Sequence, residues 1–133
     1  MSGGLVARLR SELSQRADFS GALAGSWGAL PAAELAKRQV YLEIDGAVPL
    51  GEIFDLAGSP AGRIRFVGNL ERADRLAAGL SEGEVLIEGN VGKEAGLALA
   101  GGALDIDGNA GPDTGAAPAG FKRGMTGGEI IVR

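Results

Sequence analysis

A Gly-Asn pair recurs three times in the second half of this sequence, and it constrains the fold more than any other feature. The three pairs, spaced by 21 and then 19 residues, are Gly68-Asn69, Gly89-Asn90 and Gly108-Asn109. Each follows a short run in which apolar and polar side chains alternate, as they do in a half-buried β-strand. A repeat of about 20 residues with one strand and glycine turns predicts stacked structural units, because one unit alone cannot bury its apolar side chains.

The apolar residues of these runs form columns when the repeats are aligned. The expected inner columns are Ile64, Val85, Leu104 and Ile130, and beside them Phe66, Ile87, Ile106 and Val132. Strands of successive units would lie about 4.8 Å apart, which builds a narrow aliphatic core. Ordinary β-hairpins joined at the Gly-Asn pairs are the alternative, since this dipeptide is also a hairpin turn signal.

Two further columns support the same register. One holds Leu80, Leu99 and Met125, and the other holds the small residues Ala77, Gly96 and Gly115. After two of the strands the fuller pattern Gly-Asn-x-Gly-x-x-x-Gly adds Gly92 and Gly111 to the repeat. Glycine suits such positions because it adopts positive φ and lets one backbone approach another closely.

Glycine is unevenly distributed, with 16 of the 24 residues in positions 61–133. We therefore expect residues 1–58 to form a small N-terminal α/β segment and residues 59–133 to form the glycine-rich β units. In the first segment, the spacing of Leu5, Val6, Leu9 and Leu13 predicts a helix.

The rest of the first segment is predicted from local signals. Pro31 marks the first turn of a second helix, and residues 40–44 alternate as a strand. Residues 50–56 fit either an irregular strand or a short helix. Residues 21–30 have the composition of a loop, with Trp27 as its only large anchor.

The composition excludes several classes of function. The chain has no cysteine or histidine, which excludes disulfides, zinc sites built on those residues and a Ser-His-Asp triad within this chain. Its net charge of -4 argues against a general nucleic-acid binder, since phosphate-binding surfaces are basic. The sequence shows neither an apolar signal core nor an uncharged stretch that could span a bilayer. We therefore expect a cytoplasmic protein with no nucleic-acid or membrane partner.

No catalytic, cofactor-binding or metal-binding residue can be assigned from the motifs. The run from Asp105 to Asn109 lacks the glycine and closing glutamate of an EF-hand loop, and Gly92-Lys93 lacks the rest of a P-loop. Asp105 and Asp107 share one strand face and have no distinguishable acid and base roles, as expected of solvated side chains.

The third repeat is seven residues longer than the second and contains an aromatic-plus-basic cluster. This cluster is Phe121, Lys122 and Arg123. Insertions in stacked repeats form loops on one face, and that face is often the binding one. We expect these three residues to contact a partner.

The segment from Gly89 to Gly111, followed by Lys122-Arg-Gly-Met-Thr-Gly-Gly-Glu-Ile-Ile-Val, resembles the C subunit of formylmethanofuran dehydrogenase. It is more similar still to the C subunit of the bacterial formyltransferase/hydrolase complex. Both belong to the GXGXG-domain family, which also includes the end of the glutamate synthase large subunit. The resemblance covers about residues 49–133, including Pro49-Leu-Gly-Glu-Ile-Phe-Asp-Leu and Arg72-Ala-Asp-Arg-Leu-Ala-Ala-Gly-Leu.

The resemblance implies a mainly β chain folded as a right-handed parallel β-helix, a solenoid, which acts as a non-catalytic scaffold subunit. In such a complex formyl groups pass between tetrahydromethanopterin and a methanofuran-like carrier, and formate is released, as part of formaldehyde oxidation in methylotrophy. The formyltransferase and hydrolase subunits are the implied partners, and no cofactor is implied in this chain. Molybdenum or tungsten, iron-sulfur clusters and zinc occur in other chains of the archaeal dehydrogenases.

Other interpretations stay open at this point. The chain could be the C subunit of a molybdenum or tungsten formylmethanofuran dehydrogenase, or a glutamate-synthase-type domain that transmits conformation between active sites. It could also be an enzyme whose site at a shared interface uses Lys93 and carboxylates such as Asp105, Asp107 and Asp113. Since the family continues through further coils, we expect the sequence to be truncated at its C-terminal end.

Overall fold

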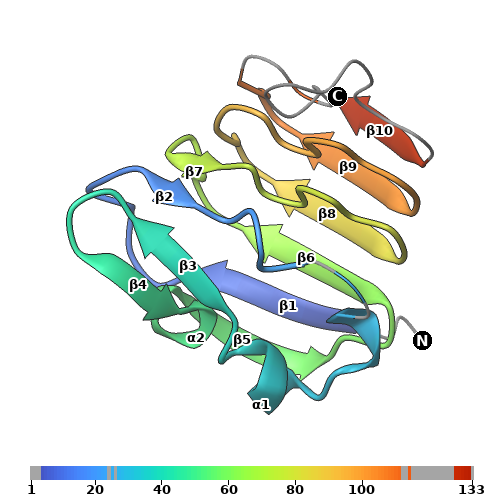
Figure 1. Ribbon diagram of the computed structural model, residues 1–133, viewed down its shortest axis with the longest axis horizontal. Helices are drawn as coiled ribbons and strands as arrows, with labels where there is room; N and C mark the ends of the chain where they lie inside the picture. Colours follow the sequence, from blue (N-terminus) through green and yellow to red (C-terminus); the bar gives the residue numbers. More distant parts are fainter. Residues whose placement is uncertain (1–3, 24, 26, 112–113, 115–127, 133) are drawn as a thin grey trace.

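The structure is a computed structural model that describes residues 4–23, 25, 27–111, 114 and 128–132, and it is mainly β (Figure 1). The strands of a larger sheet are β1 (Gly4–Leu9), β5 (Phe54–Ser59), β6 (Arg63–Val67), β8 (Glu84–Glu88), β9 (Ala103–Asp107) and β10 (Glu129–Val132). A smaller sheet contains β2 (Ala17–Asp18), β3 (Gln39–Leu42), β4 (Gly46–Pro49) and β7 (Ala73–Asp74). The helical elements are short: η1 (Trp27–Ala29), α1 (Ala32–Leu35) and α2 (Leu50–Ile53).

Both sheets are mixed. The larger one has the order β10-β9-β8-β6-β1-β5, in which only the β1–β5 pair is antiparallel. The smaller one has the order β4-β3-β2-β7, with β2 and β7 parallel. None of the helices in the described part of the chain is long and apolar enough to cross a membrane.

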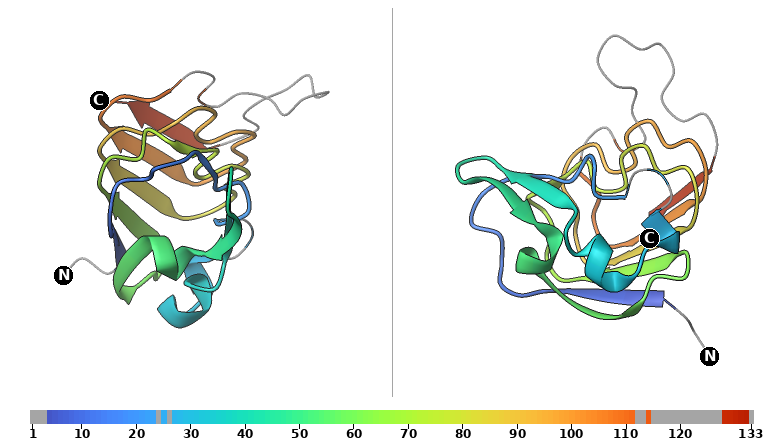
Figure 2. Two further views of the ribbon diagram at one scale, coloured as in Figure 1. Left: turned by 90° about the vertical axis from the view of Figure 1, so that its left-hand side faces the viewer. Right: turned by 60° about the horizontal axis from the view of Figure 1, so that its bottom comes forward.

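Strands β6, β8, β9 and β10 lie one above another as parallel neighbours (Figure 2). Their register aligns Ile64 with Val85, Leu104 and Ile130, which is the column that the sequence predicts. Because hairpins require antiparallel pairing, these strands exclude the hairpin alternative. Outward-facing residues alternate with the inner ones, as the five-residue runs indicate.

The Gly-Asn turns also stack. Leu70, Val91 and Ala110, each directly after one of these pairs, form parallel bridges from one unit to the next. The backbone N–H of Gly89 donates to the carbonyl of Asp107 at 3.0 Å, and that of Val91 donates to the carbonyl of Asn109 at 2.9 Å. The hydrogen bonds of the turns therefore run between units, as the strand hydrogen bonds do.

One hydrophobic core joins the two halves of the sequence. It includes Leu5 and Phe54 from the first segment as well as Leu104 from the repeats. The Phe54 ring packs edge-on against Phe66 and Phe19, with centroids 5.2 Å and 6.0 Å apart. The division of the chain at residue 58 remains a prediction.

The helix predicted from Leu5 to Leu13 is wrong, because β1 takes its place. Leu5 and Ala7 face inward and are fully buried, whereas Arg8 is exposed. Apolar residues recur here at every second position, as in a strand, and leucine recurs at every fourth position, as in a helix. The sequence pattern therefore allows either element. Here β1 lies between β5 and β6 and hydrogen-bonds to both, and this pairing outweighs helix propensity, which is a weak preference.

The other predicted elements of the first segment are present in shortened form. Pro31 precedes α1, and the strand predicted over residues 40–44 ends at Leu42. Residues 50–56 divide between the two alternatives, with α2 first and β5 following it directly. Trp27 is fully buried, and its indole N–H donates to the carbonyl of Glu82 at 3.1 Å, which ties this loop to the repeats.

Candidate functional site

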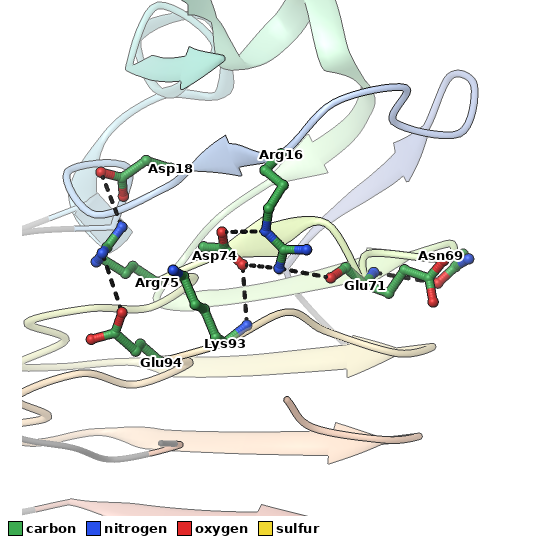
Figure 3. A network of polar contacts seen from close by, with 8 residues as sticks. All are labelled: Arg16, Asp18, Asn69, Glu71, Asp74, Arg75, Lys93 and Glu94. Atoms are coloured by element: carbon green, nitrogen blue, oxygen red, sulfur yellow. Dashed lines mark hydrogen bonds and ion pairs between the residues drawn. The ribbon is translucent and has the colours of Figure 1, made fainter. Parts of the chain in front are cut away.

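The parallel pairing of β2 with β7 brings together a group of charged side chains from three parts of the sequence. This group, here called the Asp74 cluster, consists of Arg16, Asp18, Asp74, Arg75, Lys93 and Glu94 (Figure 3). Asp18 of β2 pairs with Asp74 of β7. Arg16 directly precedes β2 and Arg75 directly follows β7, so the pairing brings all four residues close together. Lys93 and Glu94 lie in the next repeat, so the cluster connects three successive levels of the fold.

Asp74 is the one buried charged residue among those the structure describes. Its carboxylate accepts hydrogen bonds from Arg16 Nε at 2.8 Å and Nη2 at 2.5 Å, and from the Lys93 backbone N–H at 3.1 Å. The hydrogen bond that Arg16 donates to the Asp74 carboxylate, together with the charge of that carboxylate, raises the pKa of the Arg16 guanidinium above its ordinary value. A carboxylate held by two guanidinium nitrogens and an amide is compensated in charge, which suits a structural tie between segments.

Arg75 and Glu94 continue the cluster on strained backbone. Both have left-handed conformations, with φ of 56° and 58°, which non-glycine residues rarely adopt. Arg75 lies between two carboxylates, 3.5 Å from Asp18 and 3.2 Å from Glu94. The ion pairs thus link β2 to two consecutive repeats at the point where the backbone is strained.

Gly92 supplies the room that the Asp74 carboxylate needs. A Cβ at this position would lie 2.5 Å from Asp74 Oδ1 and 2.5 Å from the carbonyl oxygen of Ala73. The Gly-Asn-x-Gly pattern therefore has a local cause here: its second glycine leaves room for the buried Asp74 carboxylate directly beside the next repeat.

Two shallow pockets border the cluster. One of 330 Å³ is lined by Arg16, Glu71, Lys93 and the turns around Asn90 and Asn109. Another of 250 Å³ is lined by residues that include Arg16, Tyr41, Asp74 and Lys93. The described residues contain no group of three or more carboxylates positioned to hold a metal ion. The paired charges suit holding the repeats in place better than carrying out proton transfer.

The structure places most of the repeat residues predicted from the sequence at contacts between units. The backbone N–H of Asn109 donates to the Asn90 side chain at 3.1 Å, whereas Asn69 Oδ1 accepts from the Glu71 backbone N–H at 3.3 Å. Gly96 has a φ of 68° and faces Ile130 and Leu104. A Cβ would collide with the backbone of the preceding unit at four of the predicted glycines: Gly89, Gly92, Gly108 and Gly111.

The other predicted residues are not brought to one site. Asp105 and Asp107 lie on the outward face of β9, away from the Asp74 cluster. Asp113, Gly115, Phe121, Lys122 and Arg123 lie outside the described residues. Sequence reasoning missed the Arg16–Asp74 pair, because 58 residues separate the two and no motif connects them.

Removal of the Arg16 side chain should measurably destabilise the fold. In Arg16→Ala, the buried Asp74 carboxylate keeps the Lys93 amide but loses its charged partner. We expect the free energy of unfolding to fall by about 2 kcal/mol, a moderate value because the Arg16 side chain is 45% exposed. Chemical denaturation followed by circular dichroism measures this difference.

A matched variant separates this effect from the loss of any surface arginine. Arg8 is exposed on β1, and Arg8→Ala should change the free energy of unfolding by less than about 0.5 kcal/mol. Because the pKa of Arg16 is raised on folding, its contribution is present below that pKa and is lost only in strongly alkaline solution. Equal destabilisation by the two variants would contradict a structural role for the pair.

Comparison with known proteins finds similarity to a curated sequence and to a solved structure. The chain is 32% identical over 86 residues to the C subunit of the formyltransferase/hydrolase complex Fhc of Methylorubrum extorquens, a match that covers 65% of this chain and 32% of the relative. It also superposes on a chain of the crystal structure of the formyltransferase/hydrolase complex (FhcABCD) from the same organism, solved with methylofuran, with a TM-score of 0.73 and 26% identity. That alignment covers 96% of this chain and 55% of the other.

These matches confirm the resemblance to the C subunit that the sequence indicates. The chain spans about a third of the length of the curated relative. No family model matches the sequence.

Proposed function

We propose that this chain is part of a non-catalytic scaffold subunit of a formyltransferase/hydrolase complex, equivalent to its C subunit. The observation that carries this proposal is the structural similarity, which extends over 96% of the chain. The sequence match to a named C subunit supports it independently. Residues of both the N-terminal segment and the repeats contribute to the shared fold.

The same proposal defines the chemistry of the complex. The partner subunits would transfer formyl groups between tetrahydromethanopterin and a methanofuran-like carrier and release formate. The methylofuran in the similar structure supports a carrier of this kind. In the chain itself, Arg16 pairs with Asp74, and Arg75 pairs with Asp18 and Glu94, which supports a structural role.

We also propose that the stacked units are coils of a right-handed parallel β-helix. Three consecutive parallel pairings, β6–β8–β9–β10, support this architecture. A second support is that left-handed residues recur in equivalent turns, with Arg75, Ala77 and Gly79 in one unit and Glu94, Gly96 and Ala98 in the next. The contact residues Phe121, Lys122 and Arg123 and the cytoplasmic location remain predictions.

Co-purification tests the proposed function. The full chain, tagged and expressed in a methylotrophic bacterium that makes the complex, should carry the formyltransferase and hydrolase subunits through affinity and size-exclusion chromatography. Mass spectrometry of the purified assembly identifies the partners. Association with a molybdenum or tungsten protein would instead indicate a dehydrogenase, and a flavin protein would indicate a glutamate-synthase-type domain.

A further inference from the structure

The outward-facing residues of β1, β6, β8, β9 and β10 form one surface of the larger sheet, here called the outer face. A hollow of 380 Å³ lies on it, with Val6, Leu86 and Ile131 among its lining residues. Ile131 is 38% exposed, one of the few large apolar side chains that the described structure leaves open to solvent. Its lining also includes charged residues such as Arg65, Asp105 and Glu129, and this mixture of apolar and charged groups is typical of a protein contact surface.

The charges of the outer face are unequally compensated. On β6 and β8 they pair within the face, since Arg63 lies 2.8 Å from Glu84 and Arg65 lies 3.5 Å from Glu88. On β9 and β10, Asp107 and Glu129 form no ion pair with any other described residue. Among the described residues, the unpaired charge over β9 and β10 is therefore negative, and Ile131 lies on the second of these strands.

The apolar and acidic positions lie next to one another in the ladder. Ala103 pairs with Glu84 on one side and with Glu129 on the other, so a small residue lies between two carboxylates. In the adjacent column, Asp105 lies between Leu86 and Ile131. A lysine or arginine side chain has an apolar stem and a cationic end. It therefore matches a surface that places the small Ala103 and the apolar Leu86 and Ile131 beside carboxylates.

We propose that the outer face over β8, β9 and β10 docks a basic segment of another subunit, with an apolar side chain near Leu86 and Ile131 and a lysine against Glu129. This inference rests on the proposed function, because it identifies which face of the scaffold meets a partner. Charge complementarity identifies the occupant, because a surface with unpaired carboxylates beside apolar residues favours a basic partner and selects against an acidic one. The predicted contact at Phe121, Lys122 and Arg123 is not part of this proposal.

Two variants test the docking surface in the assembled complex. The tagged full chain is co-expressed with the other subunits of the formyltransferase/hydrolase complex and purified at about 0.15 M salt. Glu129→Lys reverses the charge at the position expected to bind the cation. Ile131→Asp replaces the exposed apolar side chain of β10 with a carboxylate. Each should reduce the amount of partner retained about tenfold. Glu52→Lys reverses an exposed charge on α2 and is the matched control, which should retain partners as the unmodified chain does.

Cross-linking supplies a measurement that does not depend on how well the variants fold. A carbodiimide joins carboxylates to lysines in direct contact, so Glu129 or Asp107 of the unmodified chain should become linked to a lysine of another subunit. Links from these residues only to a second copy of this chain, or only within this chain, would overturn the proposal. So would normal retention of partners by both variants. Failure of the unmodified chain to retain any partner would instead contradict the proposed function.

Discussion

Replacement of Gly89 by alanine is expected to lower the free energy of unfolding by about 3 kcal/mol, since it adds backbone strain to a steric clash. Gly89 has a φ of +140°, where side chains are rarely tolerated, and a Cβ there would collide with the carbonyl oxygen of Gly68. That oxygen belongs to the backbone of the preceding unit, so it cannot move aside without separating the two units. Urea denaturation of the two proteins measures the difference.

Gly21 provides the control for this experiment. No atom lies within 4 Å of a Cβ built on Gly21, and its φ is not in the left-handed region. Gly21→Ala should therefore leave the free energy of unfolding unchanged or raise it by up to about 1 kcal/mol, because alanine restricts the unfolded chain. If Gly89→Ala were as stable as Gly21→Ala, close stacking of the Gly-Asn turns would not explain the repeat.

Truncation of Ile87 is the second change with a large expected effect. Ile87 is fully buried and lies between Phe66 and Ile106 in its column. Ile87→Ala should lower the free energy of unfolding by about 2–5 kcal/mol. The loss comes from the removed buried methyl groups and from the cavity that remains, because the neighbouring strands cannot close it. Thermal and chemical denaturation should both show the lower stability.

An outward residue of the adjacent strand serves as the comparison. Asp107 is exposed on β9, and Asp107→Asn should change the free energy of unfolding by less than about 0.5 kcal/mol. The contrast between the two variants tests the assignment of inner and outer positions, because a shift of one residue would exchange them. Comparable losses in both would show that the register is wrong.

The repeats could be predicted from the sequence because their signals are local and repeated. Alternation decides which residues of β6, β8 and β9 face inward, whereas Val132 of β10, expected in an inner column, is 50% exposed. The spacing of the Gly-Asn pairs then decides which residue lies above which, so Ile64, Val85 and Leu104 align as expected. The first segment contains no repeated pattern. There the sequence predicts short elements such as α1 and β3, but not the strand β1.

What the sequence by itself determined is therefore the stacking of the glycine-rich units, with their register and their inner columns. Only the tertiary structure decided that Leu5 and Ala7 belong to a strand, because β5 and β6 provide partners that an isolated segment lacks. Only the tertiary structure also joined Arg16 to Asp74, since the pair forms through the docking of β2 on β7. The physical reason is the same in both cases: the deciding interaction lies more than 40 residues away along the chain, where local patterns carry no information.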